Sequence, residues 1–137
     1  MAGPQRVRSV LETCIYVDDL DVAQRFYEGV LGLTLFSREP DRHVFFRCGD
    51  AMFLIFAPDR TLRPDTGVPA HGARGPGHVC FAVSDDEIDA WRERFGTEDI
   101  EVEQEIRWPR GGRSLYVRDP AGNSVEIASP RIWGLND

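Results

Sequence analysis

Two short stretches decide the fold, because LETCIYV at residues 11–17 and GHVCFAV at residues 77–83 carry the same pattern. In both, apolar residues alternate with polar or small ones, as in a β-strand with one face on a core. Glu12 and His78 occupy matched positions, 66 residues apart. Because polar residues recur at matched strand positions, the sequence predicts a duplicated unit with a cleft between its copies.

The same order of elements follows each of these strands. Asp18 or Asp19 can cap a first helix and Gly32 can end it, while a second helix is expected over 85–95 with Gly96 as its stop. Each helix precedes three strands, expected at 33–38, 43–48 and 51–57 in the first copy and at 102–107, 113–118 and 124–128 in the second. The copies therefore span about 11–58 and 77–130, and a linker rich in Pro, Gly and Arg joins them over 59–76.

Length and charge restrict the class of protein. The 137 residues suit a single domain over 1–137 with its own core. A formal net charge of −7 argues against a nucleic-acid binder, which needs a basic surface. We find no signal peptide and no apolar run of about 20 residues that would span a bilayer. We expect a cytoplasmic protein with three reduced cysteines.

The matched strands nominate four equivalent positions. Glu12 corresponds to His78, and an offset of 72 between the last strands of the two copies pairs Leu54 with Glu126. Strand alternation places Glu12, His78 and Glu126 opposite the core-facing residues, so that all three would project into one hollow if the copies form a single curved sheet. One imidazole and two carboxylates suit a divalent ion such as Fe²⁺, Mn²⁺, Zn²⁺, Ni²⁺ or Co²⁺. A structural or solvent-facing role is the alternative for each residue alone.

Other side chains are expected to line the same hollow. Cys14 and Cys80 each lie two residues beyond a predicted ligand and would form small pocket walls, with Leu54 as an apolar wall. Tyr116 would face the cleft, where it can donate a hydrogen bond or a proton, or simply pack. The arginines from Arg107 to Arg113 either gather an anionic substrate or form a solvated loop.

These segments resemble the vicinal oxygen chelate superfamily of glyoxalases, bleomycin-resistance proteins and dioxygenases. The resemblance covers about residues 11–129, and its most specific motifs are YVDDL at 16–20, RFY at 25–27, VLGL at 30–33, GHVCFAV at 77–83 and GRSLYVRDPAGNSVE at 112–126. It implies an α+β fold of two tandem βαβββ modules that form a curved mixed sheet with an open, barrel-like cleft around a metal. It also implies a homodimer.

The family draws its metal ligands from the positions of Glu12, His78 and Glu126. His78 and Glu126 match the usual residue types, whereas Glu12 stands where His or Gln is common. Leu54 occupies the position of the fourth ligand of glyoxalase I and has no donor atom. The resemblance therefore implies a three-ligand site more than a glyoxalase I site.

Two functions follow as hypotheses. The first is a metal-dependent enzyme in which Glu12, His78 and Glu126 hold the ion, with Glu126 and Tyr116 as catalytic residues. Its substrate would be a small molecule with neighbouring oxygens, and lyase or isomerase chemistry, thiol transfer and oxygenation all stay open. The alternative is a metal-free binding protein that sequesters a small molecule, as bleomycin-resistance proteins do.

Overall fold

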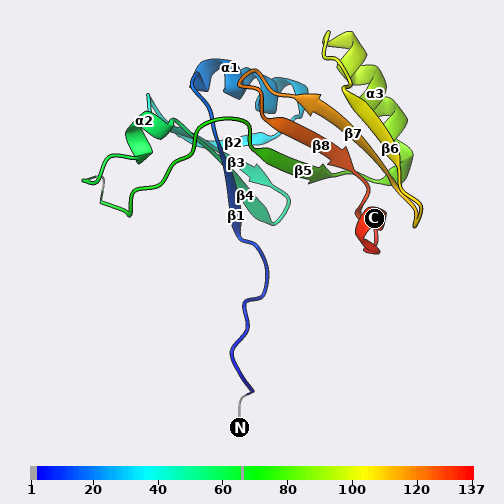
Figure 1. The fold of residues 1–137 in the computed structure, drawn as a ribbon, viewed down its shortest axis with the longest axis horizontal. Helices are drawn as coiled ribbons and strands as arrows, with labels where there is room; N and C mark the ends of the chain where they lie inside the picture. The colour runs from blue at the N-terminus through cyan, green and yellow to red at the C-terminus, as the bar shows by residue number, and fades with distance from the viewer. Residues whose placement is uncertain (1–2, 66) are drawn as a thin grey trace.

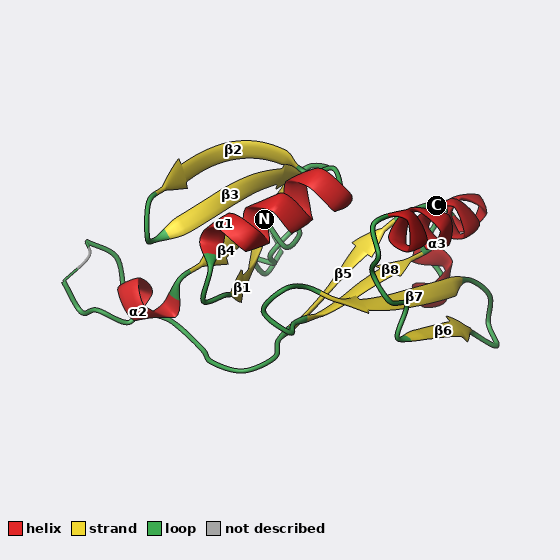
Figure 2. Cartoon of the chain, turned by 90° about the horizontal axis from the view of Figure 1, so that it is seen from above, coloured by secondary structure: helices red, strands yellow, loops and turns green. Residues whose placement is uncertain are grey.

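The chain folds into two modules of the same design, as a computed structural model that describes residues 3–65 and 67–137 shows. Each module is a four-stranded mixed sheet with its helix on one face, and the two lie side by side (Figures 1 and 2). The predicted α+β class and tandem βαβββ design are confirmed. Within the described residues, eight strands form two sheets rather than one continuous curved sheet, and neither sheet closes into a barrel.

The first module holds its strands in the order β1-β4-β3-β2, with β1 parallel to β4. Its elements are β1 (Glu12–Tyr16), α1 (Leu20–Gln24) with a π-helical continuation (Arg25–Val30), β2 (Thr34–Glu39), β3 (His43–Cys48) and β4 (Ala51–Phe56). The Asp19 carboxylate caps α1 by accepting from the amides of Asp21 and Val22. Gly32 ends the helical segment at φ 77°, in the left-handed region that favours glycine.

The second module repeats this arrangement in the order β5-β8-β7-β6, with β5 parallel to β8. Its elements are β5 (His78–Ala82), a 3₁₀ turn (Asp85–Glu87), α3 (Ile88–Thr97), β6 (Gln104–Arg107), β7 (Arg113–Arg118), β8 (Ser124–Ala128) and a closing 3₁₀ turn (Pro130–Trp133). Ser84 and Glu87 form a capping box at the start of its helical segment.

Two features of the connections differ from the sequence prediction. The linker begins with a short helix, α2 (Pro58–Thr61), because Pro58 at the first helical position has the φ that a helix needs. Helix α3 continues through Gly96 to Thr97, and the left-handed residue that follows it is Asp99 at φ 55°. Gly96 is therefore not the stop that we expected.

One hydrophobic core joins the two modules. Tyr27, which is fully buried, packs its ring against Phe53 of β4 and Phe81 of β5, with centroids 5.1 and 6.3 Å away. Its hydroxyl donates to Asp119 Oδ2 at 2.8 Å. Asn123 adds polar links, since its Nδ2 donates to the Tyr16 carbonyl at 3.2 Å and its Oδ1 accepts from the Gly77 amide at 2.7 Å. These contacts leave the opposite face of each sheet free to carry the site.

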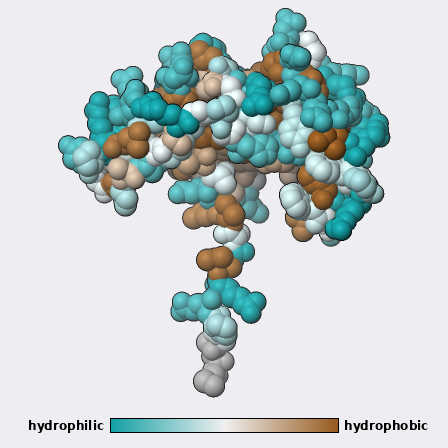
Figure 3. Space-filling model, in the orientation of Figure 1, coloured by the Kyte–Doolittle hydropathy of each residue, from teal (hydrophilic) through white to brown (hydrophobic). Residues whose placement is uncertain are grey.

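The segment before β1 extends away from the two modules (Figures 1 and 3). Val7, Val10 and Leu11 within it are 96%, 69% and 70% exposed. Within residues 3–65 and 67–137, no helix has the length and apolar character needed to cross a membrane.

Candidate functional site

The register of the strands confirms that the two modules are equivalent at the predicted site. In the first module Cys14 of β1 lies opposite Leu54 of β4, and in the second Cys80 of β5 lies opposite Glu126 of β8. The offsets of 66 and 72 residues are therefore structural equivalences. Leu54 holds in one sheet the place that Glu126 holds in the other.

His78 and Glu126 meet on the face of the second sheet that is turned away from the core. The His78 Nε2 atom lies 3.4 Å from Glu126 Oε1. His78 is at the start of β5 and is half exposed, whereas the Glu126 side chain is only 8% exposed. Register explains the contact, because the partner of Glu126 on β5 is Cys80, and His78 is the next residue on the same face.

The hydrogen bonds of His78 indicate which of its nitrogens has a free lone pair. Nδ1 lies 3.1 Å from the Ser124 carbonyl oxygen, which can only accept, so Nδ1 carries the proton. In the neutral ring Nε2 then presents a lone pair to a carboxylate oxygen that also only accepts. Two acceptors that face each other at this distance suit a shared cation such as a metal ion. A ligating histidine commonly donates its other N–H to a backbone carbonyl.

The distance between His78 Nε2 and Glu126 Oε1 also fits a metal ion. Two ligand atoms about 2.1 Å from a tetrahedral ion lie roughly 3.4 Å apart. The two oxygens of Glu126 differ in their surroundings, because Oε2 accepts a hydrogen bond from Ser114 Oγ at 2.6 Å whereas Oε1 faces His78 Nε2. The donor types, their separation and the orientation of the imidazole all fit a divalent cation held by His78 and Glu126.

Tyr116 and Cys80 flank Glu126 on neighbouring strands, Tyr116 on β7 and Cys80 on β5. Desolvation, followed by the negative charge of Glu126, raises the pKa of Tyr116 above its usual value. Cys80 is exposed as a residue, but its thiol is partly desolvated. This desolvation, and then the Glu126 carboxylate, raise the pKa of Cys80 to about 12. Both groups therefore stay protonated at neutral pH, and Cys80 fits its predicted role as a pocket wall better than that of a nucleophile.

Glu12, Cys14 and Leu54 belong to the other sheet. Glu12 and Cys14 are exposed on β1, and Leu54 on β4 is 7% exposed. Among the residues that the structure describes, no three His, Cys, Asp or Glu side chains come together as a group that could hold a metal. One chain thus brings His78 and Glu126 together but does not add Glu12, and the three-ligand set stays a prediction.

The two arginines that were predicted to bind substrate have different surroundings. The Arg113 guanidinium contacts Asp89 Oδ1 at 2.8 Å and Asp85 Oδ1 at 3.8 Å, and donates to the Asp85 carbonyl at 2.8 Å. It thereby fixes β7 to the start of the α3 segment. Arg107 is exposed at the end of β6. Substrate binding by Arg107 and Arg113 stays a prediction.

An aromatic cluster on the free face of the first sheet was not predicted. Tyr16 Oη lies 2.7 Å from His71 Nδ1, and the His71 ring packs on Phe56 with centroids 4.7 Å apart. The His43 ring stacks on Phe45 at 3.8 Å. His43 and His71 are both only partly exposed. Strand alternation could have grouped the strand residues, but nothing local places the linker residue His71 against them.

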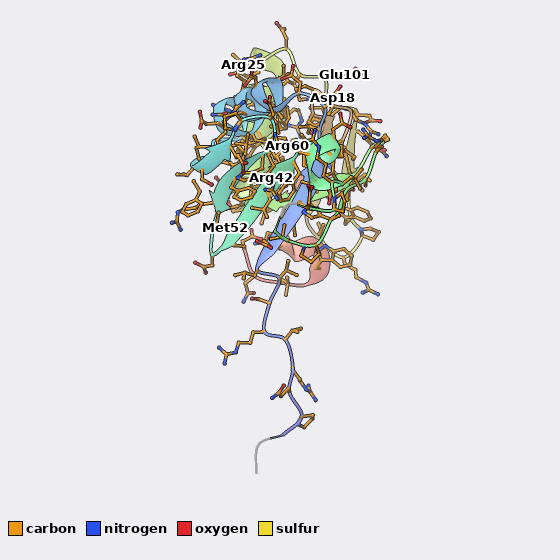
Figure 4. All side chains as sticks on the ribbon, turned by 90° about the vertical axis from the view of Figure 1, so that its left-hand side faces the viewer. Asp18, Arg25, Arg42, Met52, Arg60 and Glu101 are labelled. Carbon is orange, nitrogen blue, oxygen red and sulfur yellow. The ribbon has the colours of Figure 1, made fainter. Side chains whose placement is uncertain are left out.

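This cluster occupies one end of the first sheet. Tyr16 lies opposite Phe56 at one end of the β1–β4 pair, and Glu12 lies opposite Met52 at the other. Figure 4 labels Met52 at the end from which the N-terminal segment leaves and Arg42 further along the sheet. The Arg42 guanidinium carbon lies 5.6 Å from the Phe56 ring centroid. An aromatic surface and an exposed carboxylate therefore share one face.

Comparison with known proteins gives one family and many related structures. The sequence profile of the Glyoxalase/Bleomycin resistance protein/Dioxygenase superfamily matches residues 9–127. No curated protein matches the sequence significantly.

Three solved structures illustrate the range of similarity. A lactoylglutathione lyase from Agrobacterium tumefaciens is 44% identical with a TM-score of 0.92, and the match covers 96% of this chain and 100% of that one. A glyoxalase/bleomycin resistance protein/dioxygenase from Nocardioides is 27% identical with a TM-score of 0.72, and the match covers 92% and 85% of the two chains. TioX from Micromonospora sp. ML1, at 24% identity, a TM-score of 0.70 and coverage of 89% and 98%, shares the fold.

Proposed function

The chain belongs to the Glyoxalase/Bleomycin resistance protein/Dioxygenase superfamily, and we propose that it is a metal-dependent enzyme acting on a small molecule with two neighbouring oxygen atoms. One observation carries this proposal: His78 Nε2 and Glu126 Oε1, both acceptors when the imidazole is neutral, face each other at 3.4 Å. The carbonyl bound to Nδ1 orients the ring for this role.

The proposed ligands are His78, Glu126 and Glu12. Leu54, which is equivalent to Glu126 in the repeat, has no donor atom, so positions remain open for water or substrate. A bound Fe²⁺, Mn²⁺, Zn²⁺, Ni²⁺ or Co²⁺ ion would supply a Lewis acid that polarises a substrate carbonyl or stabilises an enediolate or alkoxide.

The chain's own residues supply binding and proton transfer. Tyr116, held in the protonated form by desolvation and by Glu126, can donate a hydrogen bond or a proton to a substrate oxygen beside Glu126. Glu126 can accept a proton from a substrate carbon or hydroxyl that lies against it. Cys80 and Ala82 provide small neutral walls on β5 around these groups.

Lactoylglutathione is the first substrate to test, since the lyase from Agrobacterium tumefaciens is 44% identical over nearly the whole chain. The leucine at position 54 gives the proposed site three protein ligands. We expect a three-ligand site to differ in metal preference or substrate from the four-ligand site that the resemblance implies for glyoxalase I, because coordination number and open positions determine what an ion can bind.

A second copy of the chain is the proposed source of Glu12. Within the described residues β1 is hydrogen-bonded to β4 and β5 to β8, so each sheet ends in an open strand edge. Exposed apolar residues, Val10 and Leu11, precede the edge of β1. Open edges of this kind pair with other chains. We therefore propose a homodimer in which Glu12 of one copy reaches His78 and Glu126 of the other.

The aromatic face of the first sheet favours a second candidate function. Tyr16, Phe45, His43 and His71 are partly exposed around the buried Phe56 and offer stacking partners for a planar compound. A chain with a net charge of −7 would also favour a cationic ligand. Metal-free binding of such a compound is the alternative, and binding that persists in a chelator would support it.

Metal content of the purified protein separates the two functions. Protein prepared without a tag or chelator is analysed by inductively coupled plasma mass spectrometry beside Glu126→Gln, with Glu101→Gln, an exposed carboxylate, as the matched control. We expect about one divalent ion per chain in the wild type and the control, and loss of the ion in Glu126→Gln. An absence of metal in the wild type, even after exposure to Mn²⁺, Fe²⁺, Ni²⁺ and Zn²⁺, would favour the binding protein.

A further inference from the structure

Ser114 on β7 is fully buried and connects Glu126 to Trp108. Its Oγ lies 2.6 Å from Glu126 Oε2, and the Trp108 Nε1 atom lies 2.8 Å from the same Oγ. Neither Ser114 nor Trp108 was among the predicted site residues. Because Glu126 is itself buried, the hydroxyl group is a fixed part of its surroundings.

The chemistry of the three groups fixes the direction of both hydrogen bonds. An indole N–H can only donate, so Ser114 Oγ accepts from Trp108. An ionised carboxylate can only accept, so the single hydroxyl proton of Ser114 goes to Glu126 Oε2. The two hydrogen bonds therefore run in one direction: Trp108 donates to Ser114, and Ser114 donates to Glu126.

The loop between β6 and β7 brings Trp108 into this position. The Trp108 amide donates to the Gly112 carbonyl at 3.0 Å, and the Gly111 amide donates to the Trp108 carbonyl at 3.0 Å. Gly112 has φ 84°, and a Cβ atom there would lie 2.8 Å from Ile132 Cγ2. The two glycines therefore permit a tight turn that places the indole over Ser114.

On the premise of the proposed metal site, we infer that Ser114, held by Trp108, is a positioning residue that selects which oxygen of Glu126 binds the ion. Oε2 already accepts the Ser114 hydroxyl proton, whereas Oε1 lies 3.4 Å from His78 Nε2, so this hydrogen bond favours Oε1 as the oxygen that binds the ion. The same hydrogen bond opposes chelation by both oxygens. Glu126 then occupies one coordination position and leaves another for substrate or water.

Metal affinity and coordination number test this inference. Co²⁺ is titrated against a competing chelator into the wild type, Ser114→Ala, Ser114→Thr and Trp108→Phe, with Ser37→Ala on β2 as the control in the other sheet. Loss of an outer hydrogen-bond partner weakens metal binding by about 10- to 100-fold, and we expect this for Ser114→Ala. We expect a smaller loss for Trp108→Phe, recovery in Ser114→Thr, which restores a hydroxyl, and no change in Ser37→Ala.

The visible spectrum of bound Co²⁺ gives a readout that a simple loss of stability would not change. If Glu126 chelates with both oxygens in Ser114→Ala, the coordination number rises and the d–d bands of the variant lose intensity. Wild-type affinity and an unchanged spectrum in Ser114→Ala would overturn the inference while leaving the metal site in place. A wild-type chain that binds no Co²⁺ would overturn the metal proposal and this inference together. Circular dichroism of each variant shows whether it is folded.

Discussion

Complementation between two defective variants tests how the metal site is assembled. Glu12→Ala removes the ligand proposed from β1 and keeps His78 and Glu126, whereas His78→Ala removes a ligand from β5 and keeps Glu12. In one chain His78 and Glu126 face each other at 3.4 Å, and no described trio of metal-binding side chains includes Glu12. If Glu12 comes from a second copy, a mixed dimer rebuilds one site from two defective chains.

The fraction of metal sites that the mixture should recover follows from the two-fold symmetry of the proposed dimer. Equal amounts of the two variants, unfolded in urea and refolded together, form mixed dimers in about half of the cases. Each mixed dimer holds one intact site and one that lacks both residues. The mixture should therefore bind metal at about one quarter of its sites.

The assay is equilibrium dialysis against Zn²⁺, with the bound ion counted by mass spectrometry. Each variant alone should bind almost no metal, and Glu101→Gln, treated in the same way, should retain full binding. A mixture that binds no more than its separate components would refute the shared site. Full binding by Glu12→Ala alone would remove Glu12 from the ligand set.

Three further predictions concern individual residues. Asn123 is 1% exposed, and its side chain forms hydrogen bonds with Tyr16, Gly77 and Asp119. Asn123→Ala should therefore lower the free energy of unfolding, measured in urea, by about 3 kcal/mol for the three lost hydrogen bonds. A decrease below about 1 kcal/mol would contradict this prediction. Burial, and then Cys14, raise the pKa of Tyr16 from 10.0 to about 12, so the folded chain holds that proton more tightly than the unfolded chain. The free energy of unfolding of the wild type should therefore fall between pH 10 and 12, and that of Tyr16→Phe should fall less. Equal decreases for the two proteins, measured by urea unfolding across this range, would argue against this role of Tyr16. Leu54→Glu places a carboxylate at the equivalent of Glu126, in a position 7% exposed. Its melting temperature should be lower than that of wild type in chelator and should rise more on addition of Ni²⁺, and an identical rise in both proteins would speak against the equivalence.

The fold could be predicted largely because the sequence repeats the pattern of one module in the other. Strand alternation over 43–48, 113–118 and 124–128 gave the bounds that the structure has for β3, β7 and β8. Hydrophobic periodicity is a local property, and burial of the apolar face follows from it. The helix ends were less certain, because Gly96 was tolerated inside α3 and Asp99 took the left-handed conformation that follows it.

The candidate site could be predicted only in part. Alternation placed His78 and Glu126 on one face, and the register of β5 with β8 brings them together as expected. It did not reveal that Arg113 is bound by Asp85 and Asp89, or that His71 from the linker contacts Tyr16. These contacts join residues that are 24 or more positions apart, and no local pattern encodes them.

The sequence by itself determined the two βαβββ modules, their equivalence and the residue types on each free face, because strand period, helix caps and turn glycines act over a few neighbouring residues. Only the tertiary structure decided that His78 Nε2 faces Glu126 Oε1, that Ser114 and Trp108 hold the other carboxylate oxygen, and that one chain leaves Glu12 outside this group. Those outcomes depend on how the two sheets pack around Tyr27, Phe53 and Phe81, and such long-range packing is settled by the whole core together.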